Sequence, residues 1–129
     1  MLHLVEFKIS PNIEIYSYVN ERGINLVEEY ITSLTEYDKN KIKTRIDFFI
    51  KRNGIMFNKE QFQFLEKGVY EFKIHGHRIL CYFMPNTNIK TLVLTHGFPK
   101  RTSEKTPKKE INKAITIREI ISSQNTTVN

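Results

Sequence analysis

The chain has 129 residues and a mass of 15.3 kDa, which suits one domain built around one hydrophobic core. Its content of 40% hydrophobic and 26% charged residues is typical of a soluble globular protein, and no apolar run approaches the roughly 20 residues of a membrane span. The single cysteine, Cys81, excludes an internal disulfide, and no segment resembles a signal peptide, so we expect a cytoplasmic protein.

The N-terminal part predicts two extended segments. Residues 4–9 alternate apolar and polar side chains in the way that a strand does. Pro11-Asn12 breaks this pattern, and residues 13–19 form a second candidate that is rich in isoleucine and tyrosine. Residues 1–12 could therefore be an N-terminal extension, in which case residues 13–19 form the first strand of the domain. The order of these two possibilities stays open.

Two amphipathic helices are predicted next. One starts at Asn25, with Glu28 completing a capping-box pattern. The other runs from about Asp38 to Asn53 and ends at Gly54, a residue typical of helix C-termini. The tight link between them predicts a helical hairpin packed on a sheet.

Residues 69–83 carry the clearest local signal, that of a β-hairpin with a two-residue turn at Gly76-His77. This register pairs apolar residues, for example Phe72 with Cys81, on one face of the hairpin. The other face then carries a mostly polar set: Glu71, Lys73, His75, Arg78, Leu80 and Tyr82.

The C-terminal part predicts a strand over residues 89–98, a helix over about 106–121, and a frayed tail over 122–129. Residues 1–129 are thus expected to form a single α+β domain. Its sheet would be a mostly antiparallel meander, packed on one face by the N-terminal helical hairpin and the C-terminal helix.

The positive charge is concentrated in the second half of the chain. Of the formal net charge of +6, residues 1–71 contribute −1 and residues 72–129 contribute +7. Five cations crowd the start of the last helix, where the helix dipole prefers acids: Lys100, Arg101, Lys105, Lys108 and Lys109. This pattern favours a polyanionic partner, most commonly nucleic acid, over the alternative of a merely solvated surface.

The polar face of the hairpin holds the groups that a metal-free ribonuclease needs, namely a base, phosphate-binding cations and an acid. Glu71 is a candidate base, Arg78 and Lys73 are candidate phosphate ligands, and the acid is Tyr82, His75 or a lysine. A solvated strand face with a cross-strand ion pair is the alternative. Without a CxxC, an HExxH or a His/Asp cluster, we expect no metal and no cofactor.

Several segments together resemble the phage-derived branch of RelE/HigB-like toxins of type II toxin–antitoxin systems, within the RelE/ParE superfamily. They are Gly68-Val69-Tyr70-Glu71-Phe72-Lys73, Arg78, Tyr82-Phe83, Gly97-Phe98-Pro99-Lys100-Arg101-Thr102, Lys105-Thr106-Pro107-Lys108-Lys109-Glu110-Ile111 and Ala114. The resemblance covers about residues 13–118. Where the family usually has Glu-Leu-Arg, this chain has Glu-Phe-Lys, and Pro99 replaces a common aliphatic residue.

The resemblance implies a RelE-like fold, ribosome-dependent endoribonuclease activity on mRNA, and neutralisation by a helix-turn-helix antitoxin, through which alone DNA would be contacted. It also implies that Lys73, Arg78 and Lys100 or Arg101 contact RNA, with Glu71 nearby. We therefore expect the catalytic set Glu71, Lys73, Arg78, Lys100 and Arg101, and the RNA-binding set His75, Tyr82, Lys105, Lys108 and Lys109. A basic RNA- or ribosome-binding module, or a protein-interaction module, without nuclease activity stays the alternative.

Overall fold

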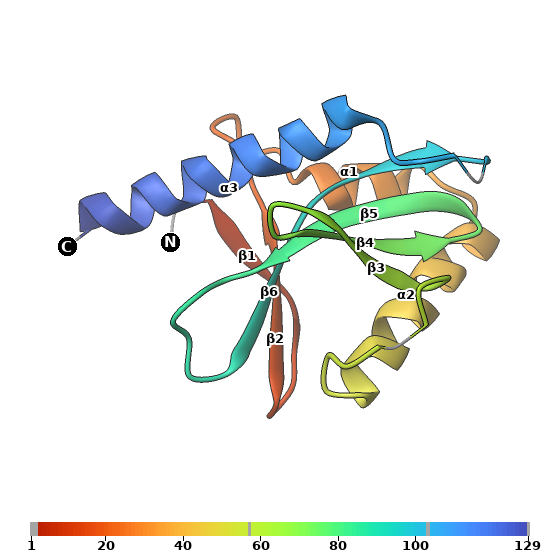
Figure 1. Ribbon diagram of the computed structural model, residues 1–129, viewed down its shortest axis with the longest axis horizontal. Coiled ribbons are helices and arrows are strands. Elements are labelled where there is room, and N and C mark those ends of the chain that lie inside the picture. Colours follow the sequence, from red (N-terminus) through yellow and green to blue (C-terminus); the bar gives the residue numbers. More distant parts are fainter. Residues whose placement is uncertain (1–2, 57, 103, 129) are drawn as a thin grey trace.

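The computed structural model describes residues 3–56, 58–102 and 104–128, the last four of these by their backbone only (Figure 1). These residues form, in chain order, β1 (Leu4–Ile9), β2 (Ile13–Tyr18), α1 (Leu26–Thr32), α2 (Glu36–Lys51), β3 (Phe62–Glu66), β4 (Val69–Ile74), β5 (Gly76–Phe83), β6 (Lys90–Lys100) and α3 (Lys108–Val128). The fold is α+β. None of the helices that the structure describes combines the length and apolar character that a bilayer crossing requires.

The described strands form one mixed sheet of six strands in the order β1-β2-β6-β5-β4-β3. All neighbours are antiparallel except β2 and β6, which run parallel from Ile13 opposite Lys90 to Ser17 opposite Leu94. A parallel pair needs a crossover connection. Here the connection comprises all elements from α1 to β5, so β2 forms hydrogen bonds with a strand that comes much later in the sequence.

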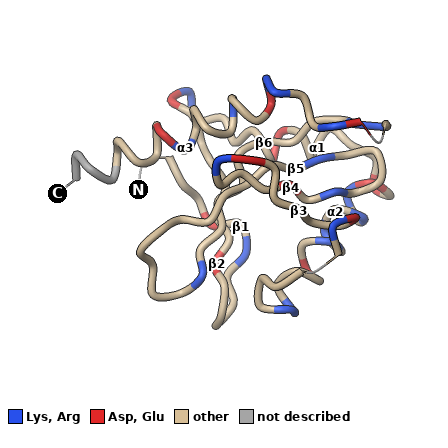
Figure 2. The backbone as a smooth tube through the Cα atoms, in the orientation of Figure 1, with Lys and Arg blue, Asp and Glu red and all other residues tan. Residues whose placement is uncertain are grey.

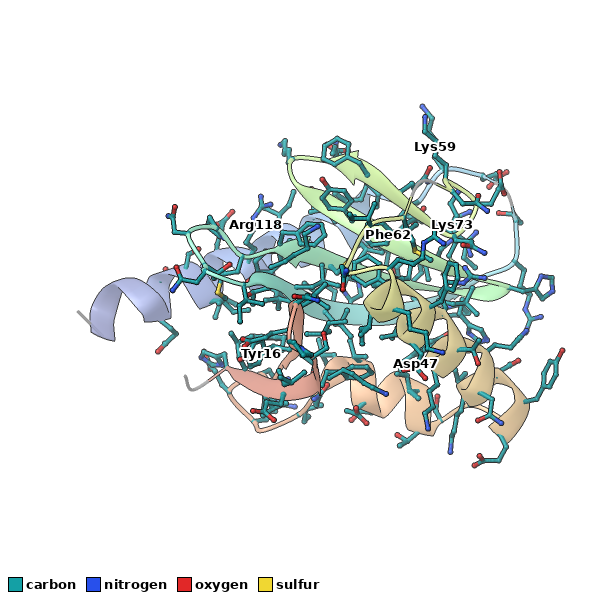
Figure 3. The ribbon with its side chains drawn as sticks, turned by 90° about the horizontal axis from the view of Figure 1, so that it is seen from below. Tyr16, Asp47, Lys59, Phe62, Lys73 and Arg118 are labelled. Carbon is teal, nitrogen blue, oxygen red and sulfur yellow. The ribbon has the colours of Figure 1, made fainter. Side chains whose placement is uncertain are left out.

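Helices α1 and α2 cover one face of the sheet. Val27, Ile46 and Phe49 point from them into a buried cluster that includes Phe72 and Leu94 of the strands. Both helices begin at a side-chain cap, since Asn25 accepts a hydrogen bond from the backbone of Glu28 and Thr35 caps α2 in the same way. Figure 3 views the molecule from the side that α2 covers.

Helix α3 covers the opposite face. Ile117 and Ile121 pack with Tyr82 and Val93, while Ile111 and Ala114 pack with Val69, Leu80 and Phe98. Figure 1 shows α3 running across the sheet on the side away from α2. The sheet is therefore the middle layer of three.

The expected RelE-like arrangement, a mostly antiparallel sheet packed by an N-terminal helical hairpin and a C-terminal helix, is wrong. The sheet is mixed, α1 has only seven residues, and α3 lies on the face opposite α1 and α2. The physical reason is that β5 and β6 are apolar on both sides. Leu80 and Val93 are fully buried on the face predicted to be open, and such a face must be covered.

The β4–β5 hairpin keeps the predicted faces but not the predicted register. Ile74 lies opposite His77, so the turn is at His75-Gly76, one residue earlier than expected. Gly76 has a φ of 83°, which glycine adopts without the strain that a β-carbon would bring. Because the pairing shifts by two residues, each side chain still points to the face that the sequence predicts.

The two ends of the chain add to the secondary structure. The candidate extension of residues 1–12 supplies β1, an edge strand paired with β2. Helix α3 includes most of the segment 122–129 for which the sequence predicts a frayed tail, and residues 1–2 and 129 lie outside the described residues.

Phe49 tests the packing of α2 on the sheet. Its ring is fully buried, with centroids 4.9 Å from Phe62 and 5.0 Å from Phe72. We expect Phe49→Ala to lower the free energy of unfolding by about 3–5 kcal/mol because it leaves a cavity beside the rings of Phe62 and Phe72. Phe48→Ala, on the exposed side of the same helix, should lower it by less than about 1 kcal/mol. Urea titration of both variants measures the difference, and equal losses would contradict this packing.

Candidate nucleic-acid interface

A groove of about 660 Å³ lies at the end of the sheet where β4, β5 and β6 meet the loop before α3. We call it the basic groove. It is lined by Arg45, Glu60, Gln63, Glu71, Lys73, Ile74, His75, Gly76, Arg78, Lys100, Arg101, Thr102, Glu104, Lys105 and Thr106. Six of these carry a positive charge and three a negative one. Figure 2 shows the lysines and arginines of these segments gathered at that end of the sheet.

The floor of the groove is the part of the sheet that α3 leaves uncovered. Lys73 lies opposite Arg78, which in turn lies opposite Phe98, so the three share one face. Helix α3 begins only at Lys108 and covers Phe98 and the apolar residues beyond it. The two cations therefore stay open to the groove although the rest of their face is core.

Glu71 forms the negative centre beneath these cations. Its side chain is only 1% exposed. Oε2 accepts a hydrogen bond from Gln63 at 2.8 Å, and Oε1 accepts one from the Thr106 hydroxyl at 2.5 Å. Both oxygens are thus occupied, as a buried carboxylate requires. Thr106 also ties the loop before α3 to β4.

Arg78 is held above Glu71 with part of its guanidinium unsatisfied. Nε lies 3.9 Å from Glu71 Oε1, and Nη1 donates to the carbonyls of His77 at 2.8 Å and Ile74 at 3.3 Å. Among the described residues, Nε has no hydrogen-bond partner although it is buried. The Glu71 carboxylate offsets the positive charge of Arg78, and the two carbonyl contacts hold the guanidinium in place at the floor of the groove.

The loop between β6 and α3 owes its shape to Lys100. Its ammonium donates to the carbonyl of Thr102 at 2.9 Å and to that of Glu104. Lys100 therefore folds back on its own loop, whereas Arg101 and Lys105 are exposed at the rim of the groove. On the far wall, Arg45 donates to the carbonyl of Lys73, and burial lowers the pKa of Arg45.

The predicted site residues divide between the groove and other places. Glu71, Lys73, His75, Arg78, Lys100, Arg101 and Lys105 all line it, with His75 exposed at the turn. Tyr82 does not: it is 3% exposed beneath α3, where burial raises its pKa. Lys108 pairs instead with Glu66 at 2.7 Å, and Lys109 is exposed on α3 outside the lining.

Among the lining residues that the sequence does not single out, three help to shape the groove. Gln63, Arg45 and Thr106 come from β3, α2 and the loop before α3, and each acts through a contact with β4. Only Thr106 carries a local signal, since it precedes a proline at a helix start, and that signal indicates a cap. Their roles depend on packing between distant segments.

A second polar cluster lies beneath α3, next to the groove. His96 is 2% exposed; its Nε2 lies 3.1 Å from Glu110 Oε1 and its Nδ1 lies 3.0 Å from the Thr95 hydroxyl. Burial lowers the pKa of His96, and the charge of Lys113 acts in the same direction, against the opposing effect of Glu110. With its proton on Nε2, a neutral imidazole donates to Glu110, while the Thr95 hydroxyl also lies within hydrogen-bond distance of the carbonyl of Leu80, at 3.1 Å.

Glu71→Gln tests the electrostatic role of the buried carboxylate. The substitution keeps the shape but leaves the charge of Arg78 without its partner, so we expect a loss of about 1–3 kcal/mol in the free energy of unfolding. Glu66→Gln is the matched control, because its pair with Lys108 is solvent-exposed and should contribute little. Thermal and urea unfolding compare the two. A Glu71→Gln variant as stable as the control would show that the carboxylate does not balance Arg78.

His96 makes stability depend on pH. Since its pKa is lowered in the folded state, the unfolded chain binds the extra proton first as pH falls below about 6.5, and stability is then lost. We expect His96→Gln to lose less stability than the wild type between about pH 7.5 and about pH 5.5. Phe48→Ala, which removes an exposed side chain without an ionisable group, should keep the wild-type pH dependence. Urea titrations at the two pH values decide, and an unchanged decrease in His96→Gln would contradict the assignment.

Comparison with known proteins places this chain in a family. The chain matches no curated protein. The model of the family described as "Phage derived protein Gp49-like (DUF891)" matches residues 29–119, more than two thirds of the chain, including all predicted site residues. That family is often associated with toxin–antitoxin modules, which suggests an antitoxin as a partner. The chain belongs to the family of phage-derived Gp49-like proteins.

Proposed function

We propose that residues 1–129 form a single toxin domain of a type II toxin–antitoxin system, a RelE/HigB-like endoribonuclease that cuts mRNA on the ribosome without a metal ion. The observation that carries the proposal is the basic groove, which Lys73 and the partly buried Arg78 line above the buried Glu71. Membership of a family associated with toxin–antitoxin modules supports it. The groove's excess of cations suits a chain of phosphates.

The chemistry follows from the ligands available. The ribose 2′-hydroxyl attacks the neighbouring phosphorus, loses its proton to a base, and expels the 5′-oxygen, which takes a proton from an acid. The products are a 2′,3′-cyclic phosphate and a 5′-hydroxyl. Arg78 and Lys73 neutralise the charge that builds up on the phosphoryl oxygens, an electrostatic contribution that is often the largest in such reactions.

Glu71 fits the role of a positioning residue better than that of a base. Its oxygens accept hydrogen bonds from Gln63 and Thr106, and its side chain is 1% exposed, so substrate has little access to it. The proposal assigns it to fixing Arg78. His75, exposed at the mouth of the groove, is the group best placed to transfer a proton.

Four further cations have supporting roles in the proposal. Lys100 shapes the loop before α3 through its carbonyl contacts. Arg101 and Lys105 hold the RNA backbone at the rim, and Lys109 extends the positive surface toward ribosomal RNA. A helix-turn-helix antitoxin is the proposed protein partner, and DNA is contacted only through it.

Primer extension on a reporter mRNA in a bacterial translation extract tests the proposal. We expect discrete new 5′ ends that appear only when the message is translated. The double variant Lys73→Ala, Arg78→Ala should reduce their yield by at least about a hundredfold, because both phosphate ligands are lost. The control is Lys51→Ala, Arg22→Ala, which removes the same two charge types from exposed positions outside the groove.

The possible outcomes separate the alternatives. Intact mRNA with blocked translation would replace the nuclease by a non-cleaving ribosome binder. An active double variant, or an inactive control, would show that the basic groove is not where cleavage is catalysed. Absence of any effect on translation would leave a protein-interaction module.

A further inference from the structure

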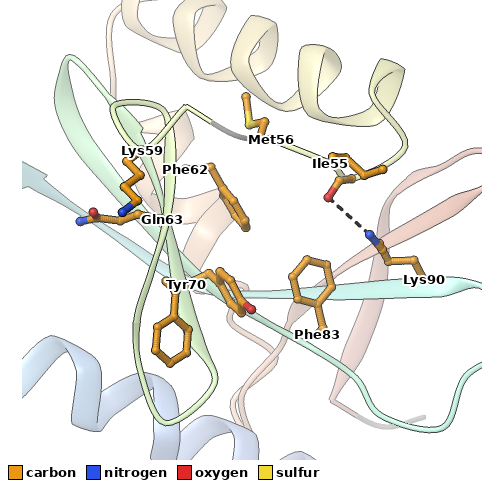
Figure 4. A pocket seen from close by; sticks show the side chains of 10 residues that line it. Ile55, Met56, Lys59, Phe62, Gln63, Tyr70, Phe83 and Lys90 are labelled. Carbon is orange, nitrogen blue, oxygen red and sulfur yellow. Dashed lines mark hydrogen bonds between the residues drawn. The ribbon is translucent and has the colours of Figure 1, made fainter.

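A second groove, of about 610 Å³, lies on the other side of edge strand β3 (Figure 4). We call it the aromatic groove. Rings from three adjacent strands form its floor, namely Phe62, Phe64, Tyr70 and Phe83. The loop after α2 forms one wall, with Ile55 and Met56, as Figure 4 shows.

The rings leave aromatic surface uncovered. Phe62 and Tyr70 stack almost in parallel, with centroids 5.3 Å apart and planes 8° apart. Phe83 and Phe64 each meet the Tyr70 ring nearly edge-on, at 5.2 Å and 5.3 Å. Phe64 is nevertheless 55% exposed and Ile55 is 48% exposed. Large apolar side chains that line a hollow in this way indicate a binding surface.

The charges around the aromatic groove have one sign. Lys59 and Lys90 are its charged lining residues, and the lining that the structure describes contains no carboxylate. Both lysines are exposed, and the ammonium of Lys90 lies 5.6 Å from the centre of the Phe83 ring. A complementary ligand joins a flat ring to a negative charge, which is the chemistry of a nucleotide.

The two grooves meet at the same edge of the sheet. Gln63 lines both of them, and its amide donates to Glu71 beneath the basic groove. Phe62 and Phe64 flank it in the sequence and point to the other face, as alternation along a strand requires. Lys59 lines the aromatic groove while its neighbour Glu60 lines the basic one. Since β3 has no outer neighbour in the described sheet, a flexible strand can pass around it.

We propose that the aromatic groove binds a base of single-stranded RNA, in continuation of the strand whose phosphate occupies the basic groove. The choice of RNA rests on the proposed function. Stacking on Tyr70 and Phe64 supplies affinity without strong sequence preference, and Lys59 and Lys90 hold the flanking phosphates. An acidic peptide with an aromatic anchor is the other class of ligand. Gln63, which lines both grooves, favours the nucleotide, because the aromatic groove then continues the surface that the proposed RNA occupies.

Fluorescence anisotropy with the full chain tests this inference without relying on cleavage. The probe is a labelled 2′-O-methyl oligouridylate, which lacks the free hydroxyl needed for attack, compared with an abasic oligomer of equal length and charge. We expect the base-bearing probe to bind roughly tenfold more tightly. Phe64→Ala should remove most of this preference, whereas Phe48→Ala, an exposed ring on α2 outside the groove, should keep it.

Charge variants separate this inference from the nuclease proposal. Lys59→Ala, Lys90→Ala should weaken both probes and lower the salt dependence of binding by about two counterions. Lys73→Ala, Arg78→Ala should also weaken both probes but leave the preference for bases intact, even if the wild type cuts no mRNA. Equal binding of the two probes, or a preference that Phe64→Ala leaves unchanged, would overturn the inference. Binding of a glutamate-rich peptide with one phenylalanine, but not of bases, in a Phe64-dependent way would replace it by a protein-docking site.

Discussion

The burial of strands β5 and β6 on both faces is the constraint on which the rest of the molecule depends. Ile79 and Leu94 point to the cluster under α1 and α2, while Leu80 and Val93 point to the side of α3. Neither set can face water without a large loss of hydrophobic free energy, so both faces need a helical layer. Helix α3 covers its face incompletely, because it starts only at Lys108, after the loop that follows β6. The basic groove is the remainder of that face.

The position of the basic groove places a positive charge where it is partly buried, and that charge has to be balanced. Arg78 sits on a strand whose neighbouring side chains are core, and its side chain is only 13% exposed. A cation there needs a nearby negative charge, which Glu71 provides from β4. Glu71 in turn depends on hydrogen bonds from β3 and from the loop before α3. One buried carboxylate thus connects edge strand β3, the loop before α3 and Arg78 of the basic groove.

Sequence patterns predict which face of β4 and β5 each side chain occupies, because alternation in a strand is a local property. They do not predict the parallel pairing of β2 with β6, since nothing local marks a partner that lies some 75 residues ahead. Tyr82 shows the same limit within one strand. It shares a face with Arg78, as predicted, but α3 covers that face at Tyr82 and not at Arg78. Periodicity in the sequence indicates which face of a strand a side chain occupies. Only packing against other elements decides whether that part of the face is exposed to solvent.

The parallel pairing of β2 with β6 also has a consequence for biosynthesis. Strands β1 and β2 can pair with each other as they emerge from the ribosome, but they cannot join the other strands until residues 90–100 have been made. The loop between β6 and α3 follows directly after β6, and its Thr106 must contact Glu71 to close the basic groove. The basic groove therefore assembles only after residues 45–106 have all left the exit tunnel.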